Sequence, residues 1–105
     1  MENMWIKYTL DSGLDAQAES PETFRIPSAN DRGSLGRGDF AKLIFRFSDS
    51  NREFVERMWV RVETVGPDGY VGILDNNPCG TGEIRAGGRV RFSSDHVIQI
   101  HRDAS

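Results

Sequence analysis

The chain has 105 residues, of which 37% are hydrophobic, 10% aromatic and 28% charged, and its formal net charge is -3. That length supports one hydrophobic core, and the composition has no disordered or fibrous bias, so we expect a single globular domain. The negative balance provides no overall positive field to attract a phosphate backbone, which disfavours nucleic acid as a partner.

The N-terminal region, residues 1–23, is expected to be a flexible segment with at most one short strand, over Trp5–Leu10. Residues 11–22 are small, acidic and polar and end in Ser20-Pro21. Such a stretch is typical of a mobile connection. We therefore expect the folded domain to begin after it.

A short helix is predicted next. Ser28 can cap its N-terminus, because a residue at this position accepts a backbone N–H from the third residue along, here Asp31. Gly33 and Gly36 follow closely and limit the helix to about two turns. The chain is then expected to turn at Gly38-Asp39 into its first long strand.

Five strands are expected after this helix, because apolar and polar residues alternate with the period of a half-buried strand. The expected strands are Phe40–Phe47, Phe54–Val65, Tyr70–Leu74, Arg89–Phe92 and His96–Ile100. The side chains expected to face the interior include Ala41, Leu43, Phe45, Phe47, Met58, Val60 and Val62. Gly66-Pro-Asp-Gly69 has the composition of a tight turn and predicts a hairpin between the second and third of these strands.

The spacing of these elements predicts a mainly β fold: a small bent antiparallel sheet, or a partly open SH3-like barrel, with one short helix. Residues 24–101 are expected to form the single β-rich domain, and residues 102–105 a C-terminal tail. An α+β arrangement is the alternative, in which the helix after Ser28 and the N-terminal strand cover one face of the sheet.

The order of short motifs resembles the YegJ-like group of small bacterial proteins, whose activity is not established. The matching motifs include Phe24-x-Ile-Pro-Ser28, Glu56-Arg-Met-Trp-Val60, Gly72-x-Leu-Asp-Asn-x-Pro78 and Gly88-x-Val-x-Phe92. The resemblance spans roughly residues 24–100 and departs at Gly87-Gly88, where a Gly-Asp pair is more typical. The resemblance implies a shared fold and a bacterial origin. Some small bacterial proteins of this general kind are accessory or immunity factors, and such a role would imply a protein partner.

Trp59 is the strongest binding candidate, because it lies between Arg57 and Arg61 on one face of the second long strand. A guanidinium can stack on the indole, or the three side chains can hold a partner's aromatic or acidic groups. The alternative is that Trp5 or the short helix covers Trp59. We expect a non-enzymatic protein-interaction module whose partner is an unidentified protein.

The connection over residues 75–88 carries Asn76 and Asn77, which we include as tentative binding residues. It lacks the ligand spacing of a calcium loop, so no metal and no cofactor are expected. Cys79 with His96 or His101 raises the alternative of a small hydrolase, but the sequence supplies no third group to orient them. No catalytic residue is therefore assigned.

A small-barrel nucleic-acid binder is the other alternative, and it requires several arginines to converge on one surface. Those arginines are Arg46, Arg57, Arg61, Arg89 and Arg91. No apolar run approaches the ~20 residues of a membrane span, no signal peptide is recognisable, and the single cysteine cannot form an internal disulfide. A cytoplasmic location is therefore expected.

Overall fold

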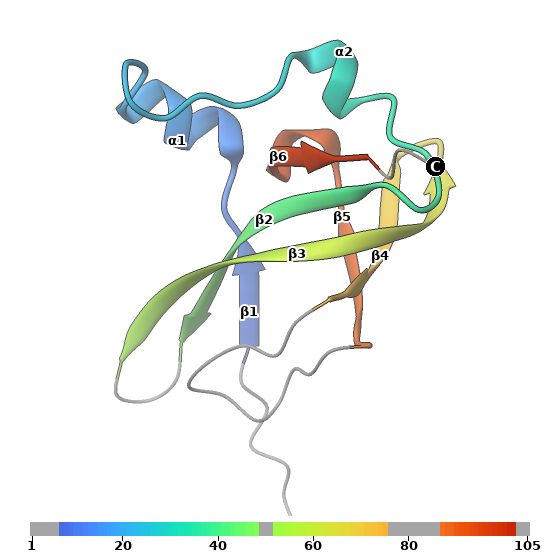
Figure 1. The fold of residues 1–105 in the computed structure, drawn as a ribbon. Coiled ribbons are helices and arrows are strands. Elements are labelled where there is room, and N and C mark those ends of the chain that lie inside the picture. The colour runs from blue at the N-terminus through green and yellow to red at the C-terminus, as the bar shows by residue number, and fades with distance from the viewer. Residues whose placement is uncertain (1–6, 49–51, 76–86, 103–105) are drawn as a thin grey trace, which may run out of the picture.

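The computed structural model describes residues 7–48, 52–75 and 87–102. Within these residues the chain forms one curled antiparallel sheet, a half-barrel, accompanied by two short helices (Figure 1). The predicted fold class, a small bent antiparallel sheet of SH3-like character, is confirmed. A search for helices long and apolar enough to cross a membrane finds none in this part of the chain.

The elements follow one another in a simple order. The strands are β1 (Lys7–Leu10), β2 (Phe40–Ser48), β3 (Glu53–Gly66), β4 (Gly69–Leu74), β5 (Arg89–Phe92) and β6 (Val97–His101). The helices are α1 (Gly13–Glu19) and α2 (Ala29–Arg32), and a 3-10 turn, η1 (Ser94–His96), joins β5 to β6. Strands β1 to β5 are neighbours in sequence order, and β6 returns to pair with β2.

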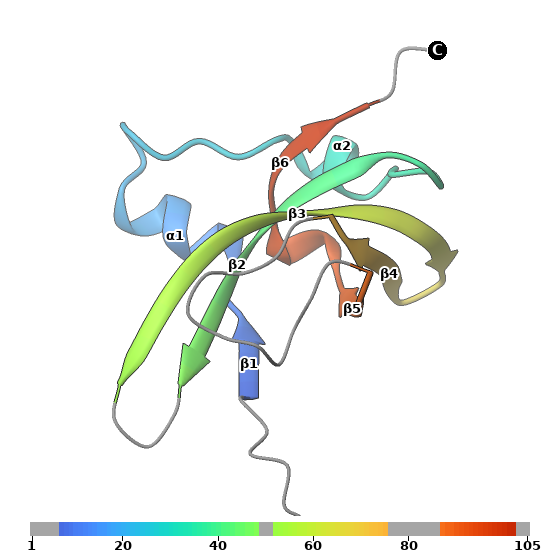
Figure 2. The same ribbon diagram turned by 60° about the horizontal axis from the view of Figure 1, so that its bottom comes forward.

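Strand β2 is central because three strands pair with it. All of β2 pairs with β3 along one edge. On the other edge, Phe45–Ser48 pair with β1 and Phe40–Leu43 pair with β6. β3 bends strongly, so β4 and β5 turn back toward β6 and the sheet curls around its apolar face (Figure 2).

The alternation predicted from the sequence is confirmed, since the side chains expected to face inward are buried. Those from β2 and β3 are Ala41, Leu43, Phe45, Phe47, Met58, Val60 and Val62. Tyr70, Leu74, Val90, Phe92 and Val97 complete the same core from the later strands. This core lies on the inner face of the half-barrel, and the opposite side of the strands is called the outer face below.

The β3–β4 hairpin turns at the predicted site, between Gly66 and Gly69. Gly69 has φ of +153°, and a Cβ atom there would lie 2.6 Å from the carbonyl oxygen of Phe92. Only glycine avoids this clash with the backbone of β5. The turn residue therefore also allows β4 and β5 to approach each other.

The N-terminal region differs from the prediction, because residues 11–22 contain α1 where an irregular mobile connection was expected. Ser12 caps this helix by accepting the N–H of Asp15 at 3.2 Å. Gly13 lies against β6, since a Cβ there would be 3.1 Å from the side chain of Ile98. The helix therefore packs where β1 ends and β6 begins.

Helix α2 is the helix predicted after Ser28, and its cap is confirmed. The Ser28 hydroxyl accepts the N–H of Asp31 at 3.1 Å. The helix has a single turn and ends at Gly33. Both helices lie on the same side of the strands as β6, and the segment joining them runs past β6 (Figure 1).

Candidate functional site

The outer face of β3 carries the predicted binding residues. Arg57, Trp59 and Arg61 alternate with the buried Met58 and Val60, so all three project away from the core. The two arginines are exposed and the indole is half-buried. The structure thus places these three side chains in one row on one surface.

The indole of Trp59 has a cationic neighbour from the adjacent strand. Lys42 of β2 is paired with Trp59, and its Nζ lies 5.6 Å from the centre of the ring. Such a contact is attractive because the ring face is electron-rich. The Arg57 guanidinium instead lies 5.1 Å from the centre of the Phe24 ring. Trp5, the residue expected in the alternative to cover the indole, lies outside the described residues.

Further cations continue the outer face across the half-barrel. Arg61 is paired with Ile73 of β4, which is paired with Arg89 of β5, and Arg91 follows on the same face. Among the described residues, the carboxylates on this surface include Glu53 beside Arg46, Glu63, whose Oε1 accepts from Arg89 Nε at 3.2 Å, and Asp75 beyond the end of β4. Positive charge therefore predominates on this face although the whole chain is acidic.

Arg46 also lies on the outer face, but its charge is paired with carboxylates. Its guanidinium donates to both carboxylate oxygens of Asp11, at 2.9 and 2.6 Å, and to Glu53 at 3.0 Å. The hydrogen bonds and charge of Asp11 raise the pKa of Arg46 further above its usual value. Two paired carboxylates offset this charge, so the five arginines of the nucleic-acid alternative do not form one uncompensated patch.

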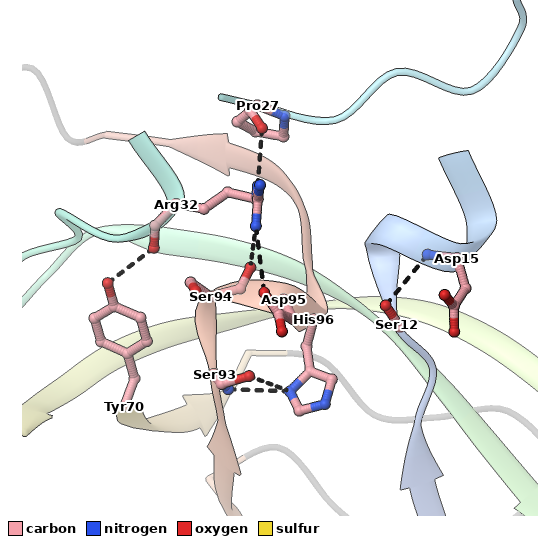
Figure 3. Close-up of polar contacts among 9 residues, drawn as sticks. All are labelled: Ser12, Asp15, Pro27, Arg32, Tyr70, Ser93, Ser94, Asp95 and His96. Atoms are coloured by element: carbon pink, nitrogen blue, oxygen red, sulfur yellow. Dashed lines mark hydrogen bonds and ion pairs between the residues drawn. The ribbon is translucent and has the colours of Figure 1, made fainter. Parts of the chain in front are cut away.

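A buried arginine fixes the segments at the helical end of the half-barrel (Figure 3). The Arg32 side chain is 7% exposed, donates to the carbonyl oxygens of Pro27 at 2.9 Å and Ser94 at 3.0 Å, and lies 3.8 Å from Asp95. The hydroxyl of Tyr70 donates to the carbonyl of Arg32 at 2.8 Å. α2, η1 and β4 are thereby joined through one residue.

His96 lies in η1 in the role of a capping residue. Its Nδ1 accepts the N–H of Ser93 at 3.0 Å, in a capping box with the Ser93 side chain. Burial lowers the pKa of His96, and the nearby carboxylate of Asp95 partly opposes this. The lowered pKa favours the neutral imidazole. Its Nδ1 is already hydrogen-bonded to the backbone of its own turn.

The remaining candidates fall where the structure gives no account of them. Asn76, Asn77 and Cys79 lie outside the described residues, so the tentative binding role of the two asparagines and the hydrolase alternative stay predictions. Across residues 7–48, 52–75 and 87–102, no three His, Cys, Asp or Glu side chains gather closely enough to hold a metal ion.

Lys42 and Phe24 also belong to the candidate site, although the sequence analysis did not predict a role for them there. The position of Lys42 could have been predicted from the sequence. β2 and β3 are antiparallel and their ends, Ser48 and Glu53, are paired, so residues equally far from the connection lie opposite each other, as Lys42 and Trp59 do. No local pattern indicates the contact of Phe24 with Arg57, because Phe24 reaches the sheet from an irregular segment.

Comparisons with known proteins do not extend this description. No protein-family model matches the chain, and neither a curated protein nor a solved structure shows a significant match.

Proposed function

We propose that this protein is a non-enzymatic interaction module that holds an acidic protein partner on the outer face of its sheet. The observation that carries the proposal is the half-buried indole of Trp59 with Lys42 against its ring and the exposed Arg57 and Arg61 on either side. Tryptophan and arginine are the side chains that most often dominate the binding energy of protein interfaces.

The position of these groups on paired strands favours recognition. Trp59 and Lys42 are paired in the β2–β3 ladder, Lys42 is also paired with Gln99 of β6, and the carbonyl of Trp59 accepts the N–H of Asp75 on its other side. A rigid backbone reduces the conformational entropy lost on binding, which supports a preformed contact surface. The core occupies the other face of the same strands, so Arg57 and Arg61 are exposed in the folded chain.

Charge favours an acidic partner. Cations outnumber carboxylates on this face, so an acidic protein surface is both attracted to it and complementary to it. Nucleic acid is disfavoured, because the whole chain is negative and the charge of Arg46 is offset by Asp11 and Glu53. An accessory or immunity-type role in the bacterial cytoplasm, expected from the YegJ-like resemblance, is compatible with a module of this kind.

A random-peptide display library, panned on the immobilised full chain, tests the proposal. Peptides selected by the wild type and not by the Arg57→Ala/Arg61→Ala double variant should be enriched in Asp and Glu. Their affinity should fall roughly tenfold in the double variant, since two charge-assisted contacts are lost. Arg37→Ala, which removes an exposed charge from the loop before β2, is the matched control and should keep full affinity.

Two outcomes would remove the proposal. The first is a selection without acidic enrichment that the double variant binds as well as the wild type does. The second is tight, steeply salt-dependent binding of a fluorescein-labelled oligothymidine, which would establish the nucleic-acid alternative instead. Absence of oligonucleotide binding at about 50 mM salt is the result we expect.

A further inference from the structure

Strand β6 is an edge of the sheet. It pairs with β2 on one side, and within the described ranges no strand pairs with its other side. Nor does any backbone hydrogen bond outside the β2 ladder involve Gln99–His101 among the residues the structure describes. An edge of this kind presents N–H and C=O groups that an added strand can use.

A groove runs along this edge. Its volume is about 430 Å³, within the range of roughly 300–1,000 Å³ typical of ligand clefts. Its lining residues are Arg25, Pro27, Asp31, Ile98, Gln99, Ile100 and Arg102. One wall is therefore β6, and the other is the extended segment that leads into α2.

The width of the groove is set by the buried Arg32. Its guanidinium joins Pro27, in the wall opposite β6, to Ser94, the first residue of η1, and η1 leads into β6 (Figure 3). The segment over residues 24–28 runs beside β6 and forms no strand with it. The wall is thus fixed near the edge strand without using its hydrogen-bonding groups, and the groove exists before any ligand binds.

The ends of the groove are cationic. Arg25 is exposed and has no ion pair with any described residue, and Arg102 is half-exposed with its Nε 3.6 Å from Asp39. Asp31 is the one carboxylate among the lining residues, and the two arginines outnumber it. Ile100 of β6 is partly exposed and supplies apolar surface to the groove, whereas Ile98 is buried. An extended segment with acidic side chains matches this combination of charge and apolar contact.

We propose that this groove binds an extended acidic peptide segment of a partner protein by strand addition to β6. The peptide backbone completes the free edge of β6, its carboxylates face Arg25 and Arg102, and its apolar side chains contact Ile100. In a strand, successive side chains point to opposite faces, so a sequence in which Glu and Val alternate satisfies both requirements. This surface adjoins the outer face around Trp59, since Gln99 is paired with Lys42, but its arginines are different ones.

Fluorescence anisotropy with a fluorescein-labelled peptide of alternating Glu and Val tests the proposal on the full chain. The wild type should bind it, and Arg25→Glu should weaken binding roughly tenfold because attraction becomes repulsion. Arg37→Glu makes the same charge change outside the groove and should bind as the wild type does. A peptide of alternating Lys and Val should bind Arg25→Glu better than it binds the wild type.

Backbone methylation of the peptide separates strand addition from simple charge attraction. N-methyl groups on one alternate set of residues block the N–H groups that face β6, and those on the other set block N–H groups that point away from β6. One methylated peptide should lose binding and the other should retain it. Equal affinity of the two, or no effect of Arg25→Glu, overturns the proposal.

Two further measurements distinguish other occupants. Arg57→Ala/Arg61→Ala should keep the affinity for the Glu-Val peptide, so a failure of the outer-face proposal leaves this result intact. Sedimentation equilibrium should show a monomer at the concentrations used. A stable dimer that excludes the peptide would overturn the proposal, because a second copy would then occupy the edge.

Discussion

The inner and outer faces of β2 and β3 share one backbone but carry different chemistry. Inward, Leu43 and Phe45 are fully buried against the later strands. Outward, Lys42 and Trp59 form a pair that solvent partly reaches, flanked by charged arginines. The contrast separates two tasks: burial on the inner face holds the half-barrel together, and we propose that the arginines and indole of the outer face contact a partner. Substitutions on the two faces should therefore differ in what they damage.

The largest effect is expected at the centre of the inner face. Phe45 has no exposed surface and lies against the rings of Tyr8 and Phe47. Phe45→Ala removes this burial and leaves a cavity, so the free energy of unfolding should fall by about 3–5 kcal/mol. Urea unfolding followed by circular dichroism measures this change. A loss below about 1 kcal/mol would mean that the core lies elsewhere.

Arg32 is the charged exception within the buried part of the molecule. Arg32→Met keeps the length of the side chain but leaves the carbonyls of Pro27 and Ser94 without their donor. The unfolding free energy should fall by about 2–3 kcal/mol, and Arg32→Lys should recover only part of it, because lysine cannot donate in two fixed directions. Arg37→Met should change stability little. If Arg32→Met is as stable as the wild type, the apolar contacts alone hold α2 to η1.

A smaller effect is expected from the half-buried His96, at the boundary between the two regions. Its folded pKa lies below the unfolded value of about 6.5, so the unfolded chain binds the proton more readily. The contribution of His96 is therefore fully present above pH 6.5 and is lost as the pH falls below it. Wild-type stability should decline between pH 7 and about 5.5 more than that of His96→Gln, which can still accept in the capping box. Parallel decline in urea titrations of both proteins would contradict this assignment.

Much of the fold could be predicted because its strongest determinant is local. Alternation along β2 and β3 identifies the buried residues, and the Gly66–Gly69 turn identifies the hairpin. Helix α1 was missed for a local reason as well: Gly13 and the Ser20-Pro21 pair indicate a connection, while the residues between them are good helix formers. The Ser12 cap and packing against Ile98 decide in favour of the helix.

The candidate sites were harder to predict because they depend on contacts between distant segments. Arg57, Trp59 and Arg61 could be placed on one face from β3 alone. The role of Arg32 could not be predicted from the sequence, because Ser94, whose carbonyl accepts from it, is 62 residues away. The groove beside β6 likewise requires knowing that residues 24–28 pass the edge without pairing with it. Such a relation leaves no periodic signal in the sequence.

The most direct test of the account is the affinity of Trp59→Ala for an acidic peptide selected on the outer face, measured with protein whose fold is verified by circular dichroism. Truncation of a half-buried indole should cost stability by only about 1–2 kcal/mol, less than Phe45→Ala. The affinity should fall at least roughly tenfold while the spectrum stays that of the wild type. A folded variant with unchanged affinity, or one that unfolds as readily as Phe45→Ala, would contradict the separation of the two faces.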